Sequence, residues 1–106
     1  MKEIVPLTFL SLIQLMETEQ RLIVLDFYAE WCGPCNKIAP DVNKLQHKFN
    51  NDILVMTVDV DECDDIVAHF NIKSMPTFLF IKNNKLLDIV VGANMSLVNE
   101  KIVLYK

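Results

Sequence analysis

The chain has 106 residues, of which 52% are apolar, and this length and composition suit a protein with one hydrophobic core. Its formal net charge of -4 and pI near 5.0 argue against general nucleic-acid binding, because the basic residues are scattered and form no phosphate-neutralising cluster. We therefore expect one globular domain over residues 1–106.

The cysteine count and the hydropathy pattern indicate the compartment. Three cysteines with only one close pair do not make the disulfide framework of a small secreted protein, which needs several bridges. Residues 7–16 resemble a signal-peptide core, but Thr8, Ser11 and Gln14 interrupt it and no small-residue cleavage site follows. No segment reaches transmembrane length. We expect a cytoplasmic protein without a membrane segment, although a processed organelle protein would look the same.

The first third of the chain predicts a strand, a helix and a second strand. Residues 4–5 suit a short strand that ends at Pro6, and Thr8 has the side chain to cap the helix that follows. Four apolar positions of that helix share one face: Phe9, Leu12, Ile13 and Met16. Residues 22–29 are nearly all apolar and predict a central strand buried on both faces, interrupted only by Asp26.

The middle of the chain continues the alternation of helices and strands. A helix is expected from Pro34, with a kink at Pro40 and apolar positions spaced by four, three and four residues. These positions are Ile38, Val42, Leu45 and Phe49. Residues 53–58 predict another central strand and residues 66–70 a short helix. The acidic run 59–65 between them reads as a solvated loop without a role in chemistry.

The last third predicts a hairpin and a closing helix. Residues 77–81 and 86–91 suit two antiparallel strands, because Asn83 and Asn84 tolerate the positive φ of a tight turn. Asn94 should cap a helix that buries Val98, Ile102 and Tyr105. The whole order predicts an α/β fold with a mixed sheet of four to five strands and helices on both faces.

The segment of residues 31–35, Trp-Cys-Gly-Pro-Cys, carries the strongest chemical signal. Its two thiols lie one helical turn apart, so they can form and break a disulfide within that turn. Cys32 begins the helix, where unpaired N–H groups and the helix dipole favour a thiolate, so it should be the attacking sulfur. Gly33 permits the sharp turn and Pro34 suits the first helical position. Cys35, one turn deeper, should be shielded from solvent.

Two other interpretations of the cysteine pair remain open at this point: a static disulfide and half of a zinc site. Zinc needs four ligands in most structural sites, and the chain offers in addition only Cys63, His47 and His69, none of them in a second close pair. We therefore expect no metal, and we interpret both histidines as ordinary surface or boundary residues.

The segment that contains the cysteine pair and four further segments carry motifs of a known protein family. The motif-bearing segments are residues 26–35 (DFYAEWCGPC), 38–40 (IAP), 58–61 (VDVD), 75–78 (MPTF) and 91–93 (VGA). Together they identify the chain as similar to the thioredoxin family over nearly its whole length, and the VDVD and MPTF segments look more like eukaryotic members than bacterial ones. The resemblance implies the thioredoxin fold and a general protein-disulfide reductase and electron carrier in cell redox homeostasis.

The resemblance also implies roles for residues outside the pair. Asp26 would be a buried carboxyl that exchanges a proton with Cys35, and burial in an apolar strand should raise its pKa independently of any resemblance. An aspartate held only by structural hydrogen bonds is the alternative. Pro76 would follow a cis peptide bond, so that the Met75 backbone pairs with substrate, whereas the local sequence alone favours a trans proline at the start of a strand.

Three more residues would contact the bound partner. By resemblance, Gly92 and Ala93 lie near it, where a missing side chain allows close backbone approach, although Gly92 also suits a simple strand end. Trp31 is expected to lie over the site, and the alternative is an ordinary half-buried aromatic residue.

Partners and cofactors follow from the same resemblance. The chain would bind no cofactor and would receive electrons from NADPH through thioredoxin reductase. Its clients would be proteins with disulfides, such as peroxiredoxins, ribonucleotide reductase and methionine sulfoxide reductase. A disulfide-forming oxidant or isomerase is the nearest rival, but it usually has histidine where this chain has Pro34. A binding module without redox activity is the rival of another class.

Several positions depart from the family pattern. Thr57 stands where many bacterial members carry a lysine near the buried aspartate, and Asn36 stands where lysine or arginine is common. Ser74 replaces a cysteine found in some relatives, which removes that route to a disulfide-linked dimer, and we expect a monomer. Cys63 resembles extra cysteines of animal members that take regulatory modifications, yet a lone cysteine at a helix start reads more simply as an ordinary thiol.

Overall fold

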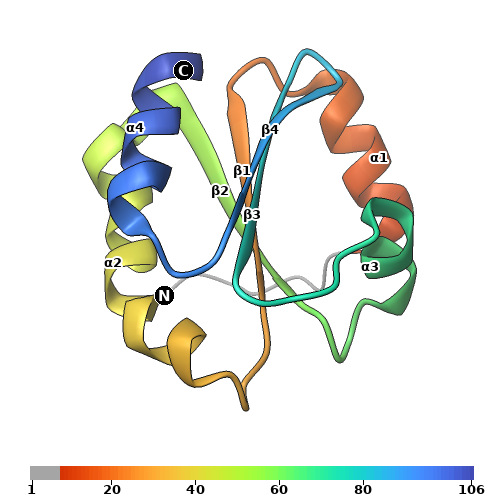
Figure 1. Cartoon of the computed structure of the whole chain (residues 1–106). Coiled ribbons are helices and arrows are strands. Elements are labelled where there is room, and N and C mark those ends of the chain that lie inside the picture. The colour runs from red at the N-terminus through yellow and green to blue at the C-terminus, as the bar shows by residue number, and fades with distance from the viewer. Residues whose placement is uncertain (1–7) are drawn as a thin grey trace.

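A computed structural model describes residues 8–106 and contains a four-stranded sheet with helices on both faces (Figure 1). In chain order the elements are α1 (Phe9–Thr18), β1 (Leu22–Tyr28), α2 (Gly33–Phe49), the 3-10 turn η1 (Asn50–Asp52), β2 (Ile53–Asp59), α3 (Asp64–Phe70), β3 (Thr77–Lys82), β4 (Lys85–Val91) and α4 (Met95–Tyr105). The α/β fold class is confirmed. The strand expected at residues 4–5 lies outside the described residues.

The sheet has the order β2-β1-β3-β4 and is mixed. Strands β1 and β2 run parallel, whereas β3 pairs antiparallel with β1 and with β4. The central strand β1 is therefore hydrogen-bonded on both sides, and six of its seven residues are buried, as a strand covered on both faces requires. The outer strands are β2 and β4.

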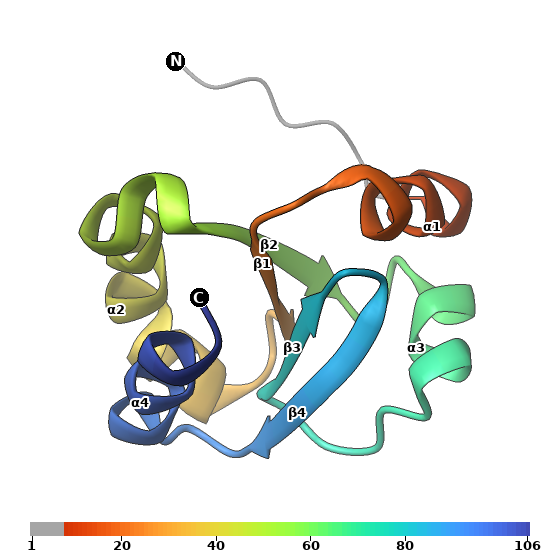
Figure 2. The ribbon, with the colours of Figure 1, turned by 90° about the horizontal axis from the view of Figure 1, so that it is seen from above.

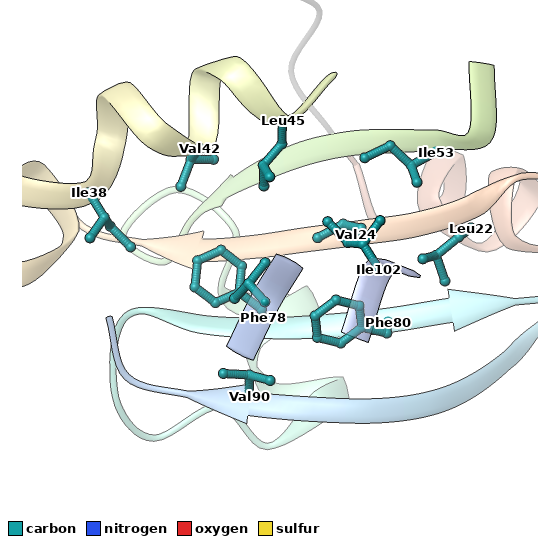
Figure 3. Packing of buried hydrophobic residues seen from close by; sticks show 11 residues of the cluster. Leu22, Val24, Ile38, Val42, Leu45, Ile53, Phe78, Phe80, Val90 and Ile102 are labelled. Carbon is teal, nitrogen blue, oxygen red and sulfur yellow. The ribbon is translucent and has the colours of Figure 1, made fainter. Parts of the chain in front are cut away.

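The sheet separates two apolar clusters. Helices α2 and α4 cover one face, and α1 and α3 cover the other (Figure 2). The first cluster joins side chains of α2 and α4 to alternate residues of the strands (Figure 3): Leu22, Val24, Ile38, Val42, Leu45, Ile53, Phe78, Phe80, Val90, Val98 and Ile102. The second contains Leu12, Met16, Ile23, Leu25, Phe27, Val58, Ile66, Leu79 and Ile81. The helix faces expected from apolar spacing are the buried ones.

The two predicted helix caps and the predicted hairpin turn are present in the structure. Thr8 accepts a hydrogen bond from the Ser11 N–H (3.0 Å) at the start of α1, and Asn94 accepts one from Leu97 (3.0 Å) at the start of α4. The hairpin between β3 and β4 turns on Asn83 (φ 54°) and Asn84 (φ 62°). These short-range predictions are confirmed because each depends on neighbouring residues alone.

Candidate functional site

The cysteine pair lies at the N-terminus of α2, where the chain leaves the buried strand β1 (Figure 1). A disulfide joins Cys32 and Cys35, whose Cα atoms are 5.3 Å apart. The N–H of Cys32 donates to the Ala29 carbonyl (3.1 Å), which closes the turn between strand and helix. Pro34 lies in the first turn of α2, where its missing N–H removes no helical hydrogen bond.

Cys32 is the N-cap residue of α2, and its sulfur is the capping atom. Cys32 Sγ accepts a hydrogen bond from the Cys35 N–H at 3.1 Å. The first turn of a helix has unpaired N–H groups and the positive end of the helix dipole, and both stabilise negative charge on this sulfur. A lowered thiol pKa is the expected consequence in the reduced protein.

Cys35 is shielded from solvent, as predicted, and in this disulfide form Cys32 is shielded to the same extent. Cys32 and Cys35 are each 5% exposed, because the bridge tucks both sulfurs against Ala29 and the partly buried Met75. What separates them is their surroundings: Cys32 Sγ lies 3.8 Å from the Met75 carbonyl oxygen, whereas Cys35 lines a pocket that contains Asp26.

Asp26 lies within β1 and is buried, with 6% of its surface exposed. Loss of hydration raises the pKa of its carboxyl from 3.8 to about 6. Its Oδ1 accepts no hydrogen bond within residues 8–106, which disagrees with the alternative of an aspartate held by structural hydrogen bonds. A buried carboxyl whose pKa is near neutrality can both accept and release a proton under physiological conditions.

A pocket of about 200 Å³ connects Asp26 with Cys35. Its lining residues come from β1, α2 and β2: Asp26, Tyr28, Cys35, Asn36, Ala39, Val42, Asn43 and Thr57. Thr57 pairs in register with Asp26 on the neighbouring strand, so the position that carries lysine in many bacterial relatives faces the same pocket here. No ionisable side chain contributes to the raised pKa of Asp26, and burial alone accounts for it.

A second loop approaches the disulfide from the start of β3. The Met75-Pro76 peptide bond is cis, as the family resemblance implied and the local sequence did not. The Gly92 N–H donates to the Pro76 carbonyl oxygen at 2.8 Å, and Gly92 adopts a φ of +102° that side chains disfavour. Met75, Pro76, Gly92 and the exposed Ala93 thus lie at the same end of the sheet as the cysteine pair, because the end of β1, the start of β3 and the end of β4 pair there.

Trp31 contacts a residue that the sequence did not bring into the site. Its indole Nε1 donates to Asp61 Oδ2 at 2.8 Å, and 69% of the residue is exposed, more than a half-buried aromatic residue would be. Asp61 belongs to the acidic run to which we assigned no role. The sequence did contain a signal for this contact. Trp31 follows the end of β1 and Asp61 follows the end of β2, and parallel neighbouring strands end at the same edge of a sheet.

The remaining singled-out residues lie around this end or on other surfaces. Asn36 donates from Nδ2 to the Glu30 carbonyl (3.0 Å) and so supports the turn before Cys32. Cys63 is partly buried at the start of α3, and burial, followed by nearby carboxylates such as Asp65, raises the pKa of its thiol. His47 and His69 are exposed, as expected. Residues 8–106 contain no cluster of three potential metal ligands, and none of their helices is long and apolar enough to cross a membrane.

Comparisons with known proteins place this arrangement in a family. The thioredoxin family model matches residues 3–103. Thioredoxin-T of Drosophila melanogaster is 48% identical over 81 residues, which cover 76% of this chain and about half (52%) of that protein. Horse thioredoxin is 44% identical over 75 residues, or 71% of this chain and 70% of the relative.

A solved structure extends the likeness to the whole fold. Fasciola hepatica thioredoxin superimposes with a TM-score of 0.89 at 40% identity, covering 93% of this chain and 95% of that one. Thioredoxins carry no bound prosthetic group, and they exchange electrons with client disulfides and with a reductase. With the family model, the relatives and the cysteine geometry in agreement, the chain belongs to the thioredoxin family of protein-disulfide oxidoreductases.

Proposed function

We propose that this chain is a general reductant of protein disulfides that works by dithiol-disulfide exchange through Cys32 and Cys35. The observation that carries the proposal is the disulfide at the N-terminus of α2, with Asp26 in the pocket behind it. In the reduced protein an extended client segment lies against Met75 and Gly92, with Trp31, Pro76 and Ala93 around it. The client disulfide is thereby presented to Cys32.

Two exchange steps follow. The Cys32 thiolate attacks one sulfur of the client disulfide, the client S–S bond breaks, and the departing client thiolate takes up a proton. Cys35 then loses its proton to the Asp26 carboxylate, directly or through water in the pocket, and attacks Cys32 Sγ. The mixed disulfide breaks, the second client sulfur leaves as a thiolate and takes up a proton from Asp26 or water, and the Cys32–Cys35 disulfide remains. The client gains two electrons and two protons, and the chain loses them.

The chain must then be reduced again. NADPH supplies the electrons through thioredoxin reductase, so the chain itself needs no bound cofactor. Peroxiredoxins, ribonucleotide reductase and methionine sulfoxide reductase are the expected clients. One structural relative, at 32% identity, comes from work on thiol resolution in a yeast mitochondrial 1-Cys peroxiredoxin, which agrees with the first of these.

The setting we propose is a monomer in the cytoplasm. A small chain with three cysteines and one local bridge suits a reducing compartment, where the disulfide is transient. Serine at position 74, exposed beside Met75, offers no thiol for a disulfide-linked dimer. Residues 1–106 then form one thioredoxin domain.

Insulin reduction tests the proposal. Wild type and the variants Cys32→Ser and Cys35→Ser are compared at equal concentration with NADPH and thioredoxin reductase. We expect wild type to turn over and both variants to lose turnover, with Cys35→Ser alone accumulating a mixed disulfide with its client. Equal turnover by all three proteins would contradict the mechanism. The variant Pro34→His addresses the rival interpretation, a disulfide-forming oxidant. A histidine at this position should make the Cys32–Cys35 disulfide more oxidising than it is in wild type.

A further inference from the structure

Strand β4 forms an outer edge of the sheet (Figure 2), and the exposed side chains of that edge are mostly apolar. Four of its seven residues are exposed apolar side chains: Leu86 (43%), Leu87 (39%), Ile89 (46%) and Val91 (64%). We call these four residues the β4 strip. Edge strands normally carry lysine, proline or charged side chains that prevent unintended pairing, so an apolar edge needs an explanation.

Asp88 is the one charged residue between Leu86 and Val91, and it does not protect the strip. Its carboxylate accepts hydrogen bonds from Lys101 Nζ (2.9 Å) and the Tyr105 hydroxyl (2.9 Å), both on α4. Asp88 is therefore held on the α4 side of the sheet. Ile89 and Leu86 pair with Leu79 and Ile81, which belong to the cluster on the other face, so these two side chains extend that apolar face to the open edge.

The strip is continuous with the surface proposed to bind client segments. Val91 is followed directly by Gly92, whose N–H is bonded to the Pro76 carbonyl. A client segment that crosses the cysteine pair, Met75 and Gly92 thus arrives at the end of β4 where the strip begins. From Val91 to Leu86 the strand spans about 17 Å, a length that five or six extended residues cover.

A second copy of this chain is the other possible occupant, and the hydrogen bonds of β4 disfavour it. The Ile89 N–H donates to Asp88 Oδ1 at 2.8 Å, so a backbone donor near the strand centre is already engaged. Two copies of β4 paired edge to edge in full register would bring their Asp88 residues together and compete for this donor. A client segment that enters from Gly92 does not need the Ile89 N–H, because it contacts the backbone of β4 only near Val91 and otherwise contacts the side chains of the strip.

We propose that the β4 strip binds the apolar, extended segment that flanks the reducible disulfide of a client protein. The proposal rests on the proposed function and defines which clients that function favours. The client disulfide occupies the cysteine pair, and the flanking residues lie along β4 with β-branched or aromatic side chains against Val91, Ile89 and Leu86. Clients whose disulfides have such a flank are reduced in preference to clients with a polar flank.

Two oxidised peptides of one disulfide core test this preference. One carries a six-residue flank of valine, isoleucine and threonine, and the other a six-residue flank of glycine and serine, each placed in turn on either side of the core. For wild type we expect kcat/KM about tenfold higher for the apolar flank in one of the two placements, mainly through a lower KM.

Ile89→Lys and Val103→Lys are the matched variants. Both place a lysine at an exposed apolar position, but Val103 (61% exposed) lies on α4, outside the strip. We expect Ile89→Lys to abolish the preference while it reduces the polar-flanked peptide as wild type does, and Val103→Lys to keep the preference. Native stability of both variants is checked by thermal unfolding.

Four results would overturn the inference. If wild type reduces both peptides equally in both placements, the strip is not a docking site. The proposed function still holds in that case, because the polar-flanked peptide is reduced. A preference that survives in Ile89→Lys, or disappears in Val103→Lys, rules it out as well. Sedimentation of a wild-type dimer that Ile89→Lys dissociates would assign the strip to a second copy.

Discussion

Asp26 and Asp88 lie on the same face of the sheet, where they pair in register with Phe78 and Phe80 of β3, yet their carboxylates have opposite surroundings. Asp88 accepts hydrogen bonds from Lys101, from Tyr105 and from a backbone N–H, and the Lys101 contact leads in lowering its pKa. Asp26 has a buried oxygen with no protein partner among residues 8–106, and burial raises its pKa to about 6. A paired carboxylate stabilises a fold, whereas an unpaired buried one is available for proton transfer.

The largest expected effect concerns the rate of proton transfer at Asp26. Asp26→Asn should slow the attack of Cys35 on a mixed disulfide by about 10²-fold at neutral pH, because the base that accepts the thiol proton is removed. In wild type this rate should rise as pH increases through about 6, the pKa of Asp26, and the variant should lack that rise. The release of a chromophoric thiol from a mixed disulfide on Cys32 measures both rates.

Asp88→Asn is the matched control for this experiment. It makes the same chemical change on the same face of the sheet, away from the cysteine pair. Its rate should equal that of wild type at every pH. If the two asparagine variants react alike, the contrast between the two carboxylates has no bearing on the chemistry.

The second effect concerns stability. The folded protein binds the Asp26 proton more tightly than the unfolded chain, so this contribution is complete below pH 3.8 and is lost as pH rises through about 6. Above pH 7, Asp26→Asn should therefore be more stable than wild type by about 3 kcal/mol, and the gain should vanish near pH 3. Urea unfolding of the oxidised proteins across this range measures it, and a gain that is independent of pH would contradict the cause given.

The third effect is electrostatic and acts through Thr57. Thr57→Lys places a cation beside Asp26 in register, on an exposed position with room for the side chain, and should lower the pKa of Asp26 by about one unit. An NMR titration of the Asp26 carboxyl carbon measures the shift. Thr57→Val, which is similar in size and neutral, should leave the pKa unchanged, and a similar shift in both variants would rule out the charge as its cause.

The smallest effect concerns the stability that Asp88 contributes, and its pH dependence should be opposite to that of Asp26. The stability from its lowered pKa is present above the ordinary aspartate pKa and is lost as pH falls through the lower folded value. Asp88→Asn should lower the melting temperature by a few degrees at pH 7 and by less at pH 2. A penalty that grows on acidification would show that the Lys101 ion pair is not its source.

What the sequence predicted well depends on neighbouring residues. The caps at Thr8 and Asn94, the positive φ of Asn83 and Asn84, and the apolar helix faces are local, and the structure confirms them. The cis bond before Pro76 came only from the family resemblance, because the contacts around it involve residues distant in the chain.

The errors and omissions at the site have a long-range cause too. Both cysteines are equally buried because Met75, which is 43 positions from Cys32, packs on the bridge, and helix position alone does not specify that contact. The contact between Trp31 and Asp61 joins residues 30 positions apart. The parallel strands β1 and β2 indicate that the acidic run begins at the same edge of the sheet as Trp31, but not which carboxylate of the run accepts the indole N–H. The irregular pairing between β3 and β4 at Phe80 and Ile81 left no mark in the apolar pattern either.

Trp31 has a consequence for how the protein can be observed. It is the only tryptophan of the chain, it immediately precedes Cys32, and most of its surface is in water. Indole emission depends on solvation and is quenched by a nearby disulfide, so the intrinsic fluorescence of this protein reports on one place. Reduction should brighten that emission and a bound client should shift it to shorter wavelength, so both events can be followed in real time without a label.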